Sequence, residues 1–129
     1  MVSYGYRKAL RTYIEATNTH KFSNVEKVLH PEAVYFFTDA TCRGYEEIGA
    51  YFNQTWNLIK EEVYSASEVE WIAISEEMAT CTYTYTYEGY LEEEFISGKG
   101  RATNVFSVIG SEWKLIHEHL SGSVKSRDE

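Results

Sequence analysis

Apolar residues recur at helical spacing near the start of the chain. Tyr6, Leu10 and Tyr13 lie three or four residues apart, so they share one side of a helix. The stripe continues to Thr17, and Asn18 interrupts it. This pattern predicts an amphipathic helix of about four turns that ends near Asn18.

Two further helices are expected before residue 63. Ser23 and Glu26 have the spacing of a capping box, which predicts a short helix that ends before Pro31. After a buried strand over residues 34–37, apolar residues at helical spacing predict a third helix over residues 45–62. The first half of the chain is therefore expected to be mainly helical.

The second half alternates between two kinds of side chain, which is typical of β-strands. Residues 80–87 read Thr-Cys-Thr-Tyr-Thr-Tyr-Thr-Tyr, so the tyrosines share one face and the threonines the other. Residues 90–98 look like an irregular acidic loop, and Gly110-Ser111 predicts a tight hairpin. Further strands are expected over residues 69–74, 100–109 and 112–120. Helices followed by an antiparallel meander predict an α+β fold, with the helices on one face of the sheet.

Composition and charge exclude several classes of partner. The 129 residues have the length of one domain, and no repeat or linker divides residues 1–129. Twelve basic and 20 acidic residues give a net charge of −8, whereas nucleic acids and anionic membranes need a basic surface. No apolar run approaches the roughly 18 residues of a membrane span, and the first residues lack the apolar core of an export signal. Cys42 and Cys81 form no disulfide framework, so a cytoplasmic location is expected.

The chain contains 11 tyrosines, and their position suggests a contact surface. Neither face of the predicted strands is clearly polar. Tyrosine alternates with threonine in one strand, and Trp71 alternates with isoleucine in another. Such a sheet is expected to be covered on both faces, and tyrosine suits an interface because it joins a large ring to a hydroxyl. A half-solvated sheet with flat-lying tyrosines is the alternative. We expect a subunit interface that includes Trp71, Tyr83, Tyr85 and Tyr87.

Four segments carry a resemblance to a known family: residues 18–22, 29–34, 43–48 and 110–121. They resemble the nuclear transport factor 2-like superfamily, and within it the SnoaL-like branch. The spacing Trp-x-x-x-His-x-His-x-Ser-Gly, which begins at Trp113, is similar to the association (hub) domain of calcium/calmodulin-dependent protein kinase II. The resemblance implies a cystatin-like cone, with three N-terminal helices packed on a strongly curved, mostly antiparallel sheet and a pocket at the open end.

The hub-like ending implies a non-catalytic domain that forms homodimers or larger rings. His117 and His119 of that ending are expected at the subunit interface. Where the hub pocket holds arginines this chain has Thr86, Asn104 and Leu120, so the resemblance implies a small neutral or weakly polar ligand. The expected pocket residues are Tyr13, Phe37, Trp56, Thr86, Asn104 and Leu120.

A small-molecule isomerase, cyclase or dehydratase is the alternative function. Related ketosteroid isomerases use a tyrosine, a carboxylate base and a second, protonated acid. Tyr13 matches the tyrosine, but Phe37 occupies the position of the base, which leaves Asp39 as the nearest carboxylate. The strand over residues 100–109 contains no Asp or Glu, so the second acid is missing there.

No metal or other cofactor is expected. His117 and His119 lie on one face of a strand, a spacing that zinc can use, but zinc needs at least one more protein ligand. Glu118 faces the other way, and no other histidine has a supporting pattern. A structural or interface role for the two histidines is therefore preferred.

Overall fold

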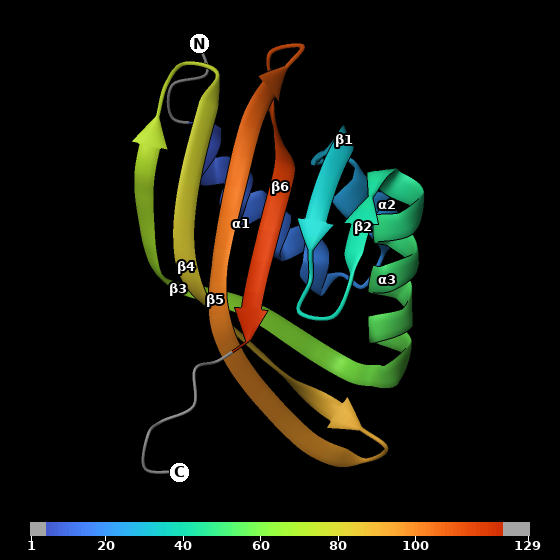
Figure 1. Cartoon of the computed structure of the whole chain (residues 1–129). Coiled ribbons are helices and arrows are strands. Elements are labelled where there is room, and N and C mark those ends of the chain that lie inside the picture. The colour runs from blue at the N-terminus through green and yellow to red at the C-terminus, as the bar shows by residue number, and fades with distance from the viewer. Residues whose placement is uncertain (1–4, 123–129) are drawn as a thin grey trace.

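The computed structural model describes residues 5–122, and it places the helices on one side of a curved six-stranded sheet (Figure 1). In chain order the elements are α1 (Gly5–Asn18), α2 (Phe22–Glu26), β1 (Leu29–Phe36), β2 (Thr41–Arg43), α3 (Gly44–Leu58), β3 (Ile59–Ile74), β4 (Met78–Leu91), β5 (Glu94–Ile109) and β6 (Glu112–Gly122). The strand order is β2-β1-β6-β5-β4-β3, and only the β1–β6 pair of this sheet is parallel. This is the expected α+β architecture with a mostly antiparallel sheet.

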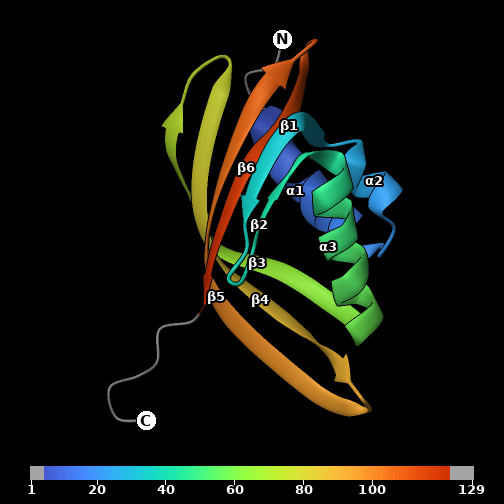
Figure 2. The same cartoon turned by 45° about the vertical axis from the view of Figure 1, so that its right-hand side comes forward.

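The sheet is strongly bent, because its long strands curl beneath the helices. Figure 2 shows the ends of β3, β4 and β5 turning under α1 toward α3. The bend coincides with irregularities in β3, where the pairing with β4 shifts between Lys60 and Val63 and between Ser67 and Glu70. Glu61 and Glu68 lie within these shifts, and both have positive φ, 56° in each case. Bulges of this kind bend a strand and increase its twist, so they open a space between the sheet and the helices.

The inner face of the sheet, which is the side that packs on α1, holds the core. Tyr13 of α1 and Phe106 of β5 are each 1% exposed. Tyr83 and Tyr85 of β4 are also buried on this face, at 3% and 6% exposed, while the threonines of β4 lie on the opposite, outer face. Because the apolar stripe of α1 needs a partner, the tyrosine face of β4 packs against the chain's own helix.

Several predicted boundaries are wrong, and two of the errors lie near the bend. The third helix ends at Leu58, and residues 59–62 belong to β3 instead. The acidic stretch over residues 90–98 is a hairpin that joins β4 to β5, with Glu92 and Glu93 at positive φ in its turn. The short helix begins at Phe22, and no side chain caps it. Within residues 5–122, no helix is long and apolar enough to cross a membrane.

Candidate functional site

A cavity of about 210 Å³ lies between α1, α3 and the bent part of the sheet. Its wall is mainly aromatic, and it includes two carboxyl side chains, Glu62 of β3 and Glu118 of β6. Such a concave, mostly apolar space with a few polar groups is the usual form of a small-molecule site. The aromatic wall consists of Tyr13, Phe37, Tyr51, Phe52, Trp56, Tyr64, Tyr85 and Tyr87.

Glu118 faces the cavity because β6 contains one extra residue. The pairing of β5 with β6 shifts between Val105 and Phe106, which are partnered by His117 and Leu115, so Ile116 is the additional residue. A one-residue bulge reverses which side of the sheet the following residues face. Leu115 and Glu118 therefore both point inward, and Glu118 is only 2% exposed.

Neutral hydrogen-bond donors surround the Glu118 carboxyl. With its amide nitrogen turned toward the carboxylate, Asn104 donates to Glu118 Oε1 at 3.2 Å and to the carbonyl oxygen of Thr103 at 3.0 Å. Burial raises the pKa of Glu118 to about 7, although hydrogen bonds from Tyr13 and Asn104 lower it in part. At neutral pH this carboxyl can therefore both release and accept a proton.

Two pairs of tyrosines extend the hydrogen-bonded network. The hydroxyl of Tyr35 donates to that of Tyr13 at 2.8 Å, and the hydroxyls of Tyr64 and Tyr83 are 2.9 Å apart. Burial is the main cause that raises the pKa of each of these four phenols well above its usual value. The four side chains therefore remain neutral, and Tyr13 and Tyr64 line the cavity as potential donors.

Glu62 supplies the second carboxyl of the cavity wall. Burial raises its pKa to about 7. The neighbouring His20 fixes the backbone here, because its ring Nε2 lies 2.7 Å from the carbonyl oxygen of Glu62. His20 also stacks on Trp56, with ring centroids 5.3 Å apart. The end of α1 and the wall of α3 are thus joined beside Glu62.

Thr17 contributes a polar group that has no partner in the structure. The residue lines the cavity one helical turn after Tyr13 and is 6% exposed. Its hydroxyl Oγ1 is buried without a hydrogen bond to any described residue. Leaving a buried hydroxyl unsatisfied costs about 1–3 kcal/mol, so a water molecule or a ligand is expected beside it.

The structure places four of the six predicted pocket residues in the cavity wall: Tyr13, Phe37, Trp56 and Leu120. Thr86 is not among them, since it alternates with Tyr85 and Tyr87 and lies on the outer face of β4. Asn104 is fully buried behind Glu118 and holds the carboxyl without lining the cavity. The prediction of Thr86 and Asn104 as pocket-lining residues is therefore wrong.

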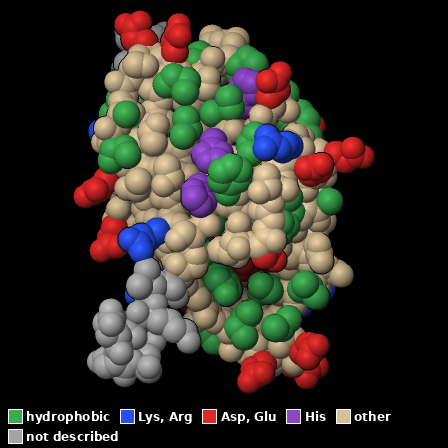
Figure 3. Space-filling view, viewed as in Figure 1, with side chains coloured by type: hydrophobic (Ala, Val, Ile, Leu, Met, Phe, Trp, Pro, Cys, Tyr) green, Lys and Arg blue, Asp and Glu red, His purple; other side chains and the backbone are tan. Residues whose placement is uncertain are grey.

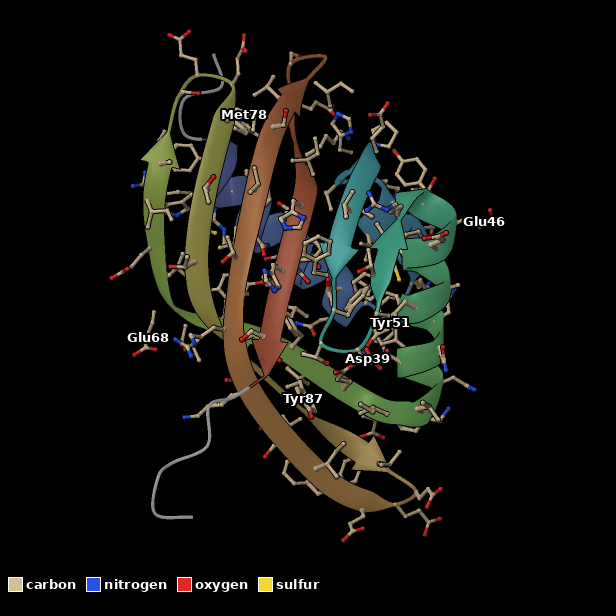
Figure 4. All side chains as sticks on the ribbon, in the orientation of Figure 1. Asp39, Glu46, Tyr51, Glu68, Met78 and Tyr87 are labelled. Carbon is tan, nitrogen blue, oxygen red and sulfur yellow. The ribbon has the colours of Figure 1, made fainter. Side chains whose placement is uncertain are left out.

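Asp39 and Tyr13 are not brought together as an acid–base pair. Asp39 is exposed in the turn between β1 and β2, and its carboxylate accepts a hydrogen bond from the Tyr51 hydroxyl at 2.6 Å (Figure 4). Tyr51 lines the cavity, whereas Asp39 does not. The carboxyl that does lie beside Tyr13 is Glu118.

The outer face of the sheet, turned away from α1, does not present the four aromatic residues expected at a subunit interface. Trp71 packs inside the chain against Tyr6, with ring centroids 4.7 Å apart, and Tyr83 and Tyr85 are buried. Tyr87 lines the cavity, so all four residues face the inside of the chain and are not available for the subunit interface expected of them. The physical reason is that the bent sheet folds its aromatic side over α1.

The two histidines do lie on the outer face. Figure 3 shows this face, with histidine side chains near its centre and acidic side chains toward its margins. His117 Nδ1 lies 2.8 Å from the carbonyl oxygen of Val34. The Phe36 ring packs against both histidine rings, with centroid distances of 4.9 Å to His117 and 5.4 Å to His119. Among residues 5–122, no group of three or more His, Cys, Asp or Glu side chains is placed to hold a metal ion.

Glu118 is the central residue that the sequence reasoning missed. The strand over residues 100–109, where a second acid is expected, is part of β5, but the acid lies on β6. A signal was present, because Leu120 was predicted to line the pocket and Glu118 is two residues away on the same strand. Residues two apart on a strand share a face, so the position of Leu120 already implied that of Glu118.

The fold defines an α+β class of protein, in which helices and a strongly bent sheet enclose a cavity, and comparison with known families specifies the class further. The chain belongs to the SnoaL-like domain family, whose model matches residues 7–125. This confirms the resemblance seen in the sequence. A comparison with curated proteins finds no match.

Several solved structures share the fold of this chain. A candidate calcium/calmodulin-dependent protein kinase II association domain from Xanthomonas campestris is 18% identical, with a TM-score of 0.83 over 94% of this chain and 87% of that one. A candidate dehydratase of the nuclear transport factor 2-like family from Streptomyces avermitilis is 15% identical, with a TM-score of 0.81 over 94% and 95%. A protein with a cystatin-like fold from Caulobacter vibrioides is 16% identical, with a TM-score of 0.78 over 96% and 89%. The predicted cystatin-like fold is thus confirmed.

Proposed function

We propose that this protein binds a small organic molecule in the aromatic cavity and exchanges a proton with it through Glu118. The observation that carries the proposal is a carboxyl group that is 2% exposed, lines the cavity and has its pKa raised to about 7 by burial. General bases and acids work best when their pKa lies near the working pH. Glu118 therefore replaces Asp39 as the acid–base group of the isomerase, cyclase or dehydratase alternative.

The surrounding phenols suit the second requirement of such chemistry. Removing a proton next to a carbonyl, or expelling a hydroxyl group, creates negative charge on an oxygen atom. Tyr64 lines the cavity with a neutral hydroxyl that shares a hydrogen bond with the Tyr83 hydroxyl, and Tyr13 lines it beside Glu118. Neutral donors held in a fixed position can stabilise that charge without reorganisation. The reaction class is proton transfer that leads to isomerisation, cyclisation or loss of water.

A neutral probe of proton abstraction tests this function. In 5-nitrobenzisoxazole a base removes one ring C–H proton, the N–O bond breaks, and a coloured phenolate forms. We expect the protein to accelerate this reaction as pH rises through about 7, because Glu118 becomes a carboxylate. Glu118→Gln should reduce the rate at least about tenfold, within the usual range for a general base. Glu92→Gln in the exposed β4–β5 turn is the matched control, and an unchanged rate in Glu118→Gln contradicts the proposal.

A second candidate function is homo-oligomeric assembly through the outer face of the sheet. Phe36 is 38% exposed there and packs against both His117 and His119, which makes an aromatic surface in the middle of the face. Large exposed aromatic groups beside a mostly uncharged surface favour contact with another subunit. The similarity to a candidate association domain also supports a homodimer or a larger ring. This assembly leaves the cavity on the other side of the sheet available to a ligand.

Light scattering on the intact chain tests the assembly. We expect a mass of at least two chains of 14.9 kDa each. His119→Glu places a carboxylate on the exposed aromatic surface, and it should shift the mass toward the monomer because a buried unpaired charge is costly. Glu92→Gln is again the control, since it lies in the distant hairpin turn. A monomeric wild-type protein would exclude this function while leaving the cavity proposal intact.

A further inference from the structure

The cavity contains two carboxyl groups but no positive charge to balance them. Glu62 and Glu118 approach it from β3 and β6, on different walls. None of the described residues that line the cavity is lysine, arginine or histidine. A group that binds here therefore meets acidic oxygens and receives no attraction from a protein cation.

The groups that face Glu118 from the neighbouring elements are also neutral. They are Tyr13 on α1, Tyr35 on β1, Tyr64 on β3, Cys81, Tyr83 and Tyr85 on β4, and Asn104 on β5. Burial raises the pKa of Cys81 to about 12, so the thiol keeps its proton at neutral pH. Burial raises the pKa of Glu62 as well, and the titratable side chain beside it is His20, whose ring contacts the Glu62 carbonyl oxygen and does not line the cavity.

The aromatic wall completes this arrangement. Phe37 and Tyr51 stack with ring centroids 3.7 Å apart, and Phe52 and Trp56 pack at 5.2 Å. Ring faces carry partial negative charge and attract organic cations, an effect that strengthens when water is excluded. Carboxylates beside several aromatic rings are thus complementary to an ammonium group attached to an apolar body.

Thr17 gives independent evidence that a polar ligand atom belongs in this space. Its hydroxyl is buried and has no hydrogen-bond partner among the described residues, although the side chain belongs to the cavity wall. The hydroxyl oxygen can accept a hydrogen bond, and the two carboxylates can also accept. The unsatisfied group and the acidic groups therefore favour the same ligand feature, an N–H donor.

We propose that the cavity recognises a small organic cation, a protonated amine on an apolar or aromatic body, held between Glu62 and Glu118 with the aromatic rings around its apolar part. This inference rests on the cavity of the proposed function and names the class of its ligand. It replaces the expectation of a neutral or weakly polar ligand, which considered Thr86, Asn104 and Leu120 but neither of the two carboxyl groups.

Binding a cation has a consequence for the acid–base group. A positive charge close to a carboxyl favours its ionised form, so the ligand lowers the pKa of Glu118 from about 7. The ligand thereby converts Glu118 into a carboxylate at neutral pH. Proton binding and cation binding oppose each other in this cavity, and affinity for the cation rises as pH increases from 6 to 8.

Three probes of similar shape and different charge test the inference: benzylamine, benzyl alcohol and benzoate. Their binding to the intact protein is measured by calorimetry at pH 8, where benzylamine is still a cation. We expect benzylamine to bind at least about tenfold more tightly than benzyl alcohol, and benzoate to bind most weakly. Tightest binding of the alcohol or of benzoate overturns the inference, and so does a lack of binding by all three.

Three variants identify the site. Glu62→Gln and Glu118→Gln should each reduce the preference for benzylamine over benzyl alcohol, because each removes a charge and leaves the shape nearly unchanged. Thr17→Val should weaken benzylamine binding and leave benzyl alcohol less affected, while Glu92→Gln, in the exposed turn, should change neither. A charge preference that survives in both glutamine variants overturns the inference.

The outcome for the ligand class is independent of the outcome for catalysis. Suppose that the rate with 5-nitrobenzisoxazole depends on Glu118 and that benzyl alcohol binds most tightly. This result supports the proposed proton exchange and excludes a cation as the ligand. Tight benzylamine binding without any Glu118-dependent rate keeps the cation site and removes the catalysis.

Discussion

The side-chain amide of Asn18 makes both backbone hydrogen bonds of Tyr64. Asn18 Nδ2 donates to the carbonyl oxygen of Tyr64 at 2.9 Å, and the backbone N–H of Tyr64 donates to Asn18 Oδ1 at 2.8 Å. The last residue of α1 therefore acts as a partner for β3 at the bend, in the way that a neighbouring strand would. This double contact positions Tyr64, a member of the cavity wall, relative to Tyr13 and Thr17 of α1.

Replacing Asn18 should destabilise the fold and loosen the cavity. Asn18→Ala removes two hydrogen bonds, and we expect the free energy of unfolding to fall by about 1–3 kcal/mol. Urea denaturation measures the loss. Asn53→Ala, at an exposed position of α3, is the matched control and should change stability by less than about 0.5 kcal/mol. Equal effects of the two variants would show that the contact with Tyr64 contributes nothing.

Glu118 should make the protein less stable as the solution becomes more alkaline. Its pKa is raised from 4.5 to about 7 in the folded state, so the folded protein binds more protons than the unfolded chain in this interval. The contribution of protonated Glu118 to the free energy of unfolding is fully present below about pH 4.5 and is lost as pH rises through about 7. At about 1.4 kcal/mol per pKa unit, the loss is on the order of 3 kcal/mol.

Denaturation curves for the wild type and Glu118→Gln at several pH values measure this effect. The glutamine stays neutral, so the variant should lose less stability between pH 5 and pH 8 than the wild type does. Glu62→Gln removes the other raised pKa and serves as the companion variant. Parallel pH dependence in wild type and Glu118→Gln would mean that Glu118 does not titrate in this range.

Removing the hydroxyl of Tyr13 should raise the pKa of Glu118 further. The hydrogen bond from Tyr13 stabilises the carboxylate form, so Tyr13→Phe leaves burial less opposed. We expect the pKa of Glu118 to rise by about one unit. One unit corresponds to about 1.4 kcal/mol, which is close to the lower end of the range of about 1.5–3 kcal/mol for a hydrogen bond to a charged group. Carbon-13 NMR of the glutamate carboxyl measures the shift. Tyr45→Phe, whose hydroxyl bonds to the carbonyl oxygen of Leu29, is the control and should leave that pKa unchanged.

Gly100 should tolerate no side chain. A Cβ atom at this position of β5 would lie 2.7 Å from the Tyr85 hydroxyl oxygen and would also collide with the backbone carbonyl of Ser121. We expect Gly100→Ala to lower the free energy of unfolding by about 1–3 kcal/mol, the usual cost of overpacking. Among residues 5–122, no atom lies within 4 Å of a Cβ placed at Gly122, so Gly122→Ala should be nearly neutral in thermal denaturation. Wild-type stability for Gly100→Ala would show that β5 and β6 can separate at this point.

The sequence predicted the elements with strong periodicity and failed where the sheet bends. The stripe through Leu10 and Tyr13 predicted the first helix, and Gly110 with Ser111 predicted the last hairpin, because both signals are local. The helix-like pattern after Leu58 was misleading, since the bulge near Glu61 and the pairing with β4 place this segment in the sheet. Pairing between distant segments decides such a region, and no local pattern records it.

The candidate site was predicted in part for the same reason. Tyr13, Phe37 and Trp56 were found because they follow a family pattern or a helix stripe. The tyrosine face of β4 was recognised as a contact surface, but alternation cannot tell which face meets the chain's own helix and which meets a partner. Leu120, two residues after Glu118, carries a signal for the inward orientation of Glu118, but alternation counted from Trp113 and Leu115 gives the opposite orientation. The bulge at Ile116 resolves this conflict, and it becomes visible only when β6 pairs with β5.

The extra residue at Ile116 determines which ionisable side chains of β6 face the cavity and which lie on the outer face. Upstream of it, Leu115 points inward, and downstream the order is reversed, so the imidazoles of His117 and His119 face out and the carboxyl of Glu118 faces in. If β6 kept all of its residues and alternated regularly through Ile116, without the bulge, two bases would face the cavity and an acid would lie on the outer face. A change of phase in one strand can therefore convert an acidic binding site into a basic one, which offers a short route between ligand classes on one scaffold.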